Sequence, residues 1–189
     1  MTRINKIGAA GCLCFLLTLA PGLLAAQAPA GNHLDNGAKK MMKSSDATFA
    51  LKAAQGGFAE VKLGQLALEK ASSTDVKSFA QKMIDDHSKA NDQLKEAAGK
   101  DRMTLPSTMD AKDQSLYNQL RDLSGPAFDK AYMKAMVKDH EEDVKEFQKE
   151  ANKGANPDIK NFASTTLPTL QEHLELAKST EQKVTSTGS

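Results

Sequence analysis

Four long segments with apolar residues spaced three or four apart dominate this 189-residue chain. We expect helices over residues 46–71, 74–98, 126–152 and 157–183, because this spacing places the apolar side chains on one face of a helix. Aromatic residues make up only 5% of the chain and β-branched runs are absent, so strands have little support. The pattern predicts an all-α fold.

Residues at the segment ends fit helix caps. Small polar residues that accept backbone hydrogen bonds are predicted to begin three of the helices: Ser45 for the first, Ser73 or Thr74 for the second, and Asn156 for the last. Gly99 and Gly154 are predicted to end the second and third helices. Pro168 lies inside the last segment and is expected to kink it.

The connection between the second and third long helices covers residues 99–125, with a short helix predicted over 110–123. A chain of that length can cross the bundle, because a helix of about 25 residues is about 38 Å long. Ferritin-like bundles carry a long crossover at this place. We predict a ferritin-like up-down four-helix bundle over residues 45–184, with a short extra helix in the crossover connection.

The two middle long helices resemble each other at an offset of 53 residues. Met83 matches Met136, and Asp86-His87 matches Asp139-His140. The similarity fits either a duplication or one packing solution reached twice.

The first 28 residues are typical of a cleaved signal peptide. Arg3 and Lys6 precede an apolar run over residues 7–19, and small residues follow Pro21. We expect an exported, periplasmic protein, with outer-membrane association as an alternative. Residues 29–44 are predicted to be a flexible leader and residues 185–189 a disordered tail.

Cysteine use fits this interpretation. Cys12 and Cys14 both lie in the predicted signal peptide, so the mature chain has no thiol and no disulfide. Lipidation of Cys12 is disfavoured, because most of the apolar run follows that residue instead of preceding it.

The charges exclude some partners. Without Arg3 and Lys6, 23 basic and 24 acidic side chains remain, and their signs alternate along the chain. No basic stripe is available for nucleic acid, and no transmembrane helix is expected in the mature chain. A second copy of the chain and a partner in the cell envelope both stay open.

Four polar residues interrupt the apolar faces. Glu60, His87, His140 and His173 each take a core position near the middle of a predicted long helix. Helix midpoints share one level of a bundle whatever the direction of each helix, so these side chains should meet inside it. Buried ionisable groups are costly unless they are paired or bind a metal.

This set of residues suits a mononuclear metal site. Imidazole and carboxylate ligands bind Fe, Zn, Cu, Mn or Ni. Asp143, Asp86 and Asp139 are predicted to support the ligands from outside, Asp143 because it follows His140 by three residues. The alternative is a polar network in which the histidines hydrogen-bond to Glu60, Asp143 or each other.

Recognised catalytic arrangements are missing. No Ser-His-Asp, Cys-His or Gly-x-Ser-x-Gly pattern occurs, so we assign no catalytic residue and the sequence favours a non-enzymatic protein. Met83, Met133 and Met136 are interpreted as core residues, although thioethers also bind copper.

Several segments together resemble one bacterial family. They are Phe58-Ala-Glu-Val-Lys-Leu-Gly-Gln-Leu-Ala, Phe79-Ala-Gln-Lys-Met-Ile-Asp-Asp-His-Ser, Phe128-Asp-Lys-Ala-Tyr-Met-Lys-Ala-Met-Val-Lys-Asp-His and Leu167-Pro-Thr-Leu-Gln-Glu-His-Leu. This combination is similar to domain-of-unknown-function family 4142, whose exported members are often labelled outer-membrane proteins. The resemblance implies a ferritin-like helical bundle and no established activity.

The chain departs from ferritin-like di-iron enzymes at the positions that bridge two metals. Those enzymes use Glu-x-x-His on two helices. Three residues before each core histidine stand Ile84, Val137 and Leu170. The sequence therefore argues against ferroxidase chemistry. It leaves two hypotheses: a non-enzymatic envelope or stress-related protein, or a metal-binding or redox protein with a mononuclear His/Glu site.

Overall fold

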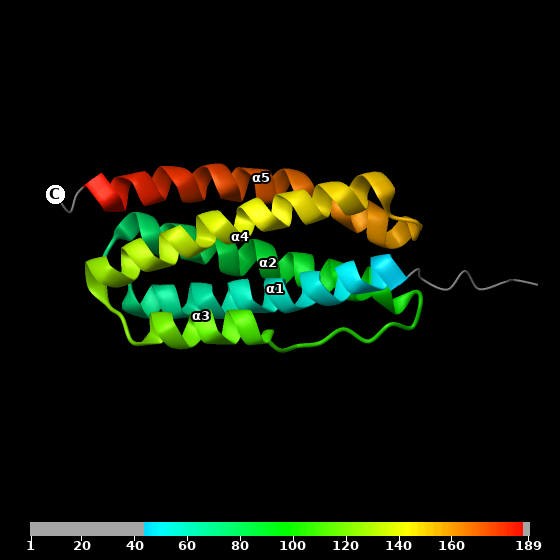
Figure 1. The fold of residues 1–189 in the computed structure, drawn as a ribbon, viewed down its shortest axis with the longest axis horizontal. Coiled ribbons are helices and arrows are strands. Elements are labelled where there is room, and N and C mark those ends of the chain that lie inside the picture. Colours follow the sequence, from blue (N-terminus) through cyan, green and yellow to red (C-terminus); the bar gives the residue numbers. More distant parts are fainter. Residues whose placement is uncertain (1–43, 187–189) are drawn as a thin grey trace, which may run out of the picture. The chain divides into compact units, whose positions relative to one another are not determined.

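The computed structural model describes residues 44–186. The predicted signal peptide with both cysteines, nearly all of the predicted leader, and residues 187–189 lie outside this part of the chain. Five helices are present within it: α1 (Ser44–Lys70), α2 (Thr74–Gly99), α3 (Ala111–Arg121), α4 (Gly125–Lys153) and α5 (Pro157–Ser186). The prediction of an all-α bundle with a short helix in the crossover is confirmed (Figure 1).

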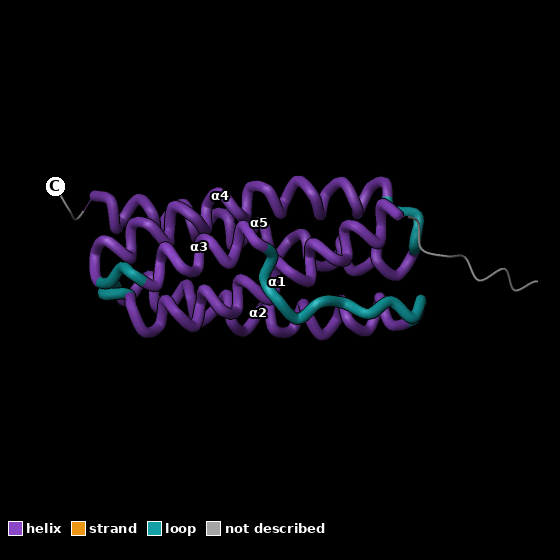
Figure 2. Tube along the Cα trace, turned by 60° about the horizontal axis from the view of Figure 1, so that its bottom comes forward, coloured by secondary structure: helices purple, strands orange, loops and turns teal. Residues whose placement is uncertain are grey.

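The four long helices form two hairpins that pack against each other. α1 packs along α2, and α4 packs along α5. Contacts of α2 with α5 and of α1 with α4 join the hairpins, while α3 lies against α1 and α4. The segment between α2 and α3 runs back to the middle of the bundle, and α3 continues from there to the end where α4 begins (Figures 1 and 2). None of the described helices is long and apolar enough to cross a membrane.

Some predicted helix ends were wrong by one or more residues. Helix α1 already begins at Ser44, so Ser45 lies in its first turn and is not the N-cap. Asp110 caps α3 from outside through the Asp113 backbone N–H, which moves the start of that helix to Ala111. Helix α5 continues through Pro168 to Ser186, beyond the predicted end at residue 183.

Two other predicted caps are confirmed. The Ser73 hydroxyl accepts a bond from the Val76 N–H at the start of α2. The Asn156 side-chain oxygen accepts bonds from the backbone N–H groups of Asp158 and Ile159, at 2.9 and 3.1 Å. These bonds satisfy N–H groups that have no partner within the helix itself.

A glycine allows α1 and α2 to approach closely. A Cβ atom added to Gly64 would lie 3.0 Å from the Ala80 carbonyl oxygen and 2.8 Å from the Ile84 side chain. Any larger residue would push the helices apart at this point. The helix stability lost by placing glycine there, about 1 kcal/mol against alanine, is offset by closer packing.

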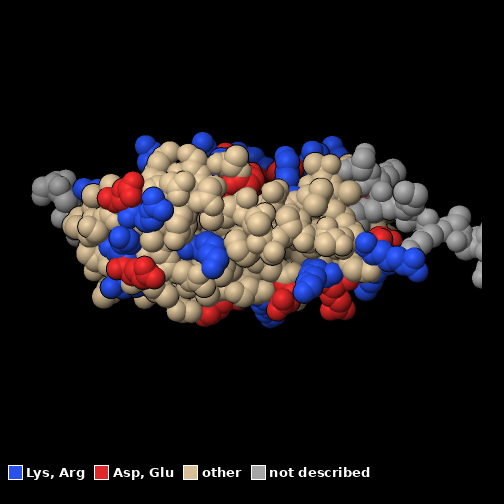
Figure 3. Space-filling view, turned by 90° about the horizontal axis from the view of Figure 1, so that it is seen from below, with Lys and Arg blue, Asp and Glu red and all other residues tan. Residues whose placement is uncertain are grey.

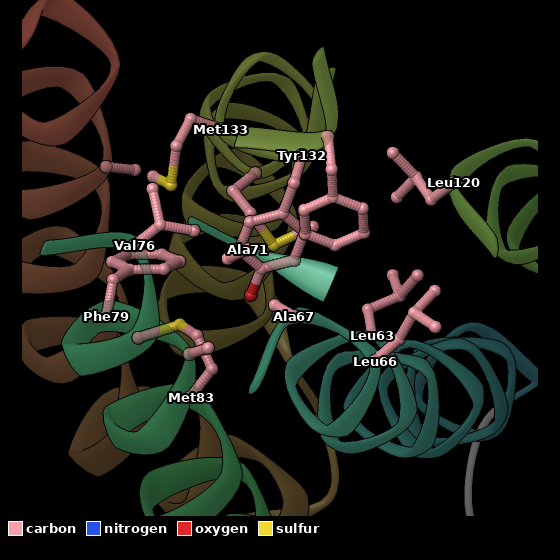
Figure 4. Packing of buried hydrophobic residues seen from close by; sticks show 14 of the residues in the cluster. Leu63, Leu66, Ala67, Ala71, Val76, Phe79, Met83, Leu120, Tyr132 and Met133 are labelled. Atoms are coloured by element: carbon pink, nitrogen blue, oxygen red, sulfur yellow. The ribbon is translucent and has the colours of Figure 1, made fainter. Parts of the chain in front are cut away.

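The apolar core is divided into two clusters. One cluster contains Phe79, Met83, Tyr132, Met133 and Met136, with Leu120 of α3 packed beside it (Figure 4). The other contains Phe49, Leu94, Phe147, Phe162 and Leu170. On every long helix the two clusters are separated by one of the four buried polar residues, namely Glu60, His87, His140 and His173. The predicted common level of these residues is therefore present.

Each hairpin turn is held by an aspartate of the other hairpin. The Asp129 carboxylate on α4 accepts bonds from the backbone N–H groups of Ser72 and Ser73 and from the Ser72 hydroxyl, at 3.1, 2.9 and 2.6 Å. At the other end of the bundle, Asp46 on α1 accepts bonds from the N–H groups of Ala155 and Asn156, at 3.2 and 2.7 Å. Both aspartates are buried.

We expect Asp129→Ala to destabilise the protein by about 2–4 kcal/mol, because three donors lose their acceptor and two of them are backbone groups. The free energy of unfolding, measured by urea titration, checks this. Asp92→Ala, at an exposed position on α2, is the control and should change stability by less than about 0.5 kcal/mol. Equal losses in the two variants would show that the clamp contributes nothing.

Charges of both signs are mixed on the face that carries α3 (Figure 3). Lys112 of α3 is 2.8 Å from Glu142 of α4. This face has no continuous basic stripe, which agrees with the charge pattern of the sequence.

Candidate metal centre

Three histidines from three helices meet between the two apolar clusters. One possible ligand nitrogen from each of His87, His140 and His173 lies within 4.8 Å of the others. The ring centroids are 5.4 to 5.8 Å apart. The side chains are 6%, 0% and 1% exposed, respectively. The sequence prediction thus identified three residues that the fold brings together.

Each ring keeps one buried nitrogen without a hydrogen-bond partner. These atoms are His87 Nε2, His140 Nε2 and His173 Nδ1. Leaving a buried polar atom unpaired costs about 1–3 kcal/mol. A metal ion could bind all three of these nitrogens at once, and each of them would then have a partner.

The second nitrogen of two rings is held by the protein. The Nδ1 atom of His140 lies 2.9 Å from the Met136 carbonyl oxygen, to which it can only donate. The Nε2 atom of His173 lies 2.8 Å from Asp86 Oδ2 and donates to that carboxylate. In the neutral ring these bonds place the lone pair on the other nitrogen, which is the unpartnered one.

Burial keeps the three rings neutral. It lowers the pKa of His87 well below its usual value, and the neighbouring His140 and His173 lower it further. Burial also lowers the pKa of His140 to about 4, against the opposing effect of its bond to Met136. The pKa of His173 is lowered by burial too, although Asp86 opposes the change. Neutral imidazoles can bind a metal without first losing a proton.

Asp86 supports the centre from α2. Burial disfavours its charge, but the hydrogen bonds from Lys82 and His173 outweigh burial and lower its pKa. Lys82 Nζ lies 2.9 Å from Asp86 Oδ2, the same oxygen that accepts from His173. Asp86 was predicted to be a supporting residue, and it orients His173 of α5 although it is the chain neighbour of His87.

Glu60 lies at the level of the histidines but does not join their group of ligand atoms. The charged groups that act on Glu60 are the carboxyl groups of Asp139, Asp143 and Asp113. Burial and the adjacent Asp139 raise the pKa of Glu60 well above its usual value. As a carboxylate, Glu60 has no hydrogen-bond partner for either oxygen; once protonated it donates to Asp139.

Asp139 and Asp143 therefore face α1 and Glu60, and no hydrogen bond to a histidine ring is found for either. Burial and Asp139 raise the pKa of Asp143 well above its usual value. Asp113 of α3 completes this acidic group, and sequence reasoning missed it. Burial, Asp110 and Asp139 raise its pKa to about 6. The sequence placed Asp113 three residues after the predicted start of the short helix. It did not indicate which long helices α3 would contact.

The cluster can accept one transition-metal ion after a small contraction. Metal–nitrogen bonds of about 2.0–2.1 Å place ligand nitrogens about 3.3–3.6 Å apart in tetrahedral or trigonal geometry. The nitrogens of the three rings lie within 4.8 Å of one another. Their separations would therefore shorten by up to about 1.2–1.5 Å. Imidazole ligands suit Zn, Cu, Fe and Ni.

The fold and this cluster define a class: a ferritin-like helical bundle with a three-histidine group in its core. The chain belongs to the family described as Domain of unknown function (DUF4142), which it matches over residues 32–180. Comparison with curated proteins found no match.

A solved structure has a similar fold. It is described as the crystal structure of a DUF305 fragment from Deinococcus radiodurans, and the TM-score is 0.66. The likeness covers 75% of this chain and 98% of that one, with 13% sequence identity. At this identity the likeness concerns the fold alone.

Proposed function

We propose that the protein binds one transition-metal ion through His87, His140 and His173 and acts in the cell envelope after export. The observation that carries the proposal is the set of three unpartnered, buried nitrogens on three neutral rings. The periplasmic location rests on the signal-like sequence of the first 28 residues.

The surroundings of the three histidines favour holding a metal over turning over a substrate. The rings are at most 6% exposed and lie between two apolar clusters, so a bound ion would be shielded from water. His140 and His173 are oriented by Met136 and Asp86 before any ion binds. A non-enzymatic role in metal retention or metal stress fits these features. A mononuclear redox function is the alternative, and it needs a metal such as Cu or Fe that has two oxidation states.

The test is metal analysis of the untagged mature protein, prepared from the periplasmic fraction and then challenged with Zn, Cu, Fe, Mn and Ni. We expect about one equivalent of one metal, together with a rise in melting temperature that EDTA reverses. Protein that retains none of the five metals would contradict the proposal. Recovery in the cytoplasmic fraction alone would contradict export.

A further inference from the structure

We propose that Glu60, Asp113, Asp139 and Asp143 form a second cation site, made only of oxygen ligands, for Ca²⁺ or a cation of similar hardness. The site is separate from the three histidines. It does not depend on metal binding by them.

The four carboxyl groups come from three helices that meet beside a cleft. Asp139 and Asp143 are one turn apart on α4, so they lie on the same side of that helix. Asp113 lies in the first turn of α3. These three aspartates line an open cleft, together with Lys112 and Phe49 among others.

Glu60 reaches the same group from α1. Its side chain is 1% exposed, and neither carboxylate oxygen has a hydrogen-bond partner. The neighbours that act on its charge are all carboxyl groups: Asp139, Asp143 and Asp113. A buried, unpaired carboxylate is strongly unfavourable, so Glu60 must take either a proton or a cation.

Local cations compensate only part of this negative charge. The Lys112 ammonium is 3.9 Å from Asp139, and its shorter contact, at 2.8 Å, is with Glu142 outside the group. Burial raises the pKa values of Glu60, Asp113 and Asp143, and the neighbouring carboxyl groups raise them further. A divalent ion among these groups would oppose both effects.

The ligand type favours a hard ion. Ca²⁺ binds carboxylate oxygens at about 2.3–2.6 Å, so oxygens on opposite sides of the ion are about 4.6–5.2 Å apart. The acidic group offers carboxylate oxygens only, which is the ligand type that Ca²⁺ prefers, whereas structural Zn²⁺ sites are built mainly from Cys and His.

Terbium luminescence tests the site, because Tb³⁺ replaces Ca²⁺ and is excited through nearby tyrosine. The chain has no tryptophan and two tyrosines, Tyr117 on α3 and Tyr132 on α4. We expect the folded mature protein to bind one Tb³⁺ with tyrosine-sensitised emission that excess Ca²⁺ abolishes. Isothermal titration with Ca²⁺ gives the affinity directly.

The decisive variant is Glu60→Gln, which keeps the shape and removes the charge. It should weaken Ca²⁺ and Tb³⁺ binding at least tenfold, and Asp143→Asn should do the same if Glu60→Gln fails to fold. Glu141→Gln removes a charge from an exposed position on α4 and should bind as the natural protein does. Unchanged binding in a folded Glu60→Gln or Asp143→Asn variant, or no binding by the natural protein, would overturn the proposal.

A histidine variant separates this site from the proposed function. His140→Leu should lose transition-metal binding and keep Ca²⁺ binding. Loss of Ca²⁺ binding in this variant would mean that the histidines and the carboxyl groups form one combined site. That result would overturn the separate acidic site and leave metal binding by the histidines standing.

Discussion

Replacing His140 with leucine is expected to weaken transition-metal binding at least a hundredfold and to leave the metal-free protein as stable as before or about 1 kcal/mol more stable. One ligand of three is lost, and even residues that only orient ligands change affinity by about 10–100-fold. Stability does not fall, because the unpartnered Nε2 atom disappears from a fully buried position and leucine fills a similar volume.

Two measurements check this pair of effects: metal titration, and urea unfolding in the presence of EDTA. Met136→Leu is a suitable control, because it changes a buried side chain one turn away on α4 without removing a nitrogen. It should retain metal affinity. A loss of more than about 2 kcal/mol in metal-free His140→Leu would indicate that the histidine is a structural residue whose hydrogen bonds support the core.

Acid should remove more stability from the natural protein than from His140→Leu. The pKa of His140 is about 4 in the folded state and near 6.5 in the unfolded chain. A group with a lowered folded pKa contributes stability above the unfolded pKa, and that contribution is lost as the pH falls towards the folded value. Since one pKa unit corresponds to about 1.4 kcal/mol, the loss from His140 between pH 7 and pH 4 is about 3 kcal/mol.

The natural protein must be compared with His140→Leu, because the buried carboxyl groups change stability with pH in the direction opposite to that of His140. Glu60, Asp113 and Asp143 have raised pKa values, so their contribution is greatest at low pH and is lost as the pH rises through those values. Both proteins contain these groups, and their effect cancels in the difference. Urea unfolding in EDTA at pH 4, 5, 6 and 7 should show the difference in unfolding free energy growing by about 3 kcal/mol towards pH 4. A difference that stays constant with pH would contradict neutral burial of His140.

The sequence was sufficient to predict the common level of the polar residues. His87, His140 and His173 lie near their helix midpoints, and a bundle aligns midpoints without any knowledge of the tertiary contacts. Helix rotation was harder to predict, because a small turn about the axis changes which neighbour a side chain meets. For this reason Glu60 was grouped with the histidines, although it faces Asp139.

Contacts between helices that are distant in sequence were also beyond prediction. The helical repeat of α2 gives the direction in which Asp86 points from that helix. It does not indicate that the partner of Asp86 is His173 on α5. Asp113 belongs to a short helix whose position around the bundle depends on the path of the long connection before it. Periodicity predicts the buried face of one helix; it does not tell which helix will cover that face.

The aspartate clamps at the two ends of the bundle have a consequence for its symmetry. Asp129 lies 83 residues after Asp46, and the turn residues Ala155 and Asn156 lie 83 residues after Ser72 and Ser73. The same offset pairs Val76 with Ile159, Phe79 with Phe162 and Ala80 with Ala163, all of them buried. The α1–α2 and α4–α5 hairpins thus share these positions, and each hairpin holds the turn of the other. The offset of 53 that relates α2 to α4 in sequence differs from this one.

The carboxyl groups and the histidines differ in how they follow the offset of 83 residues. The offset of 83 pairs Glu60 with Asp143, so two of the four carboxyl groups of the acidic cluster occupy equivalent positions on α1 and α4. The histidines have no such counterparts: His140 corresponds to Gly57, His87 to Leu170 and His173 to Ala90. Two of the carboxyl groups thus occupy matching positions on the two hairpins, whereas no histidine corresponds to another histidine.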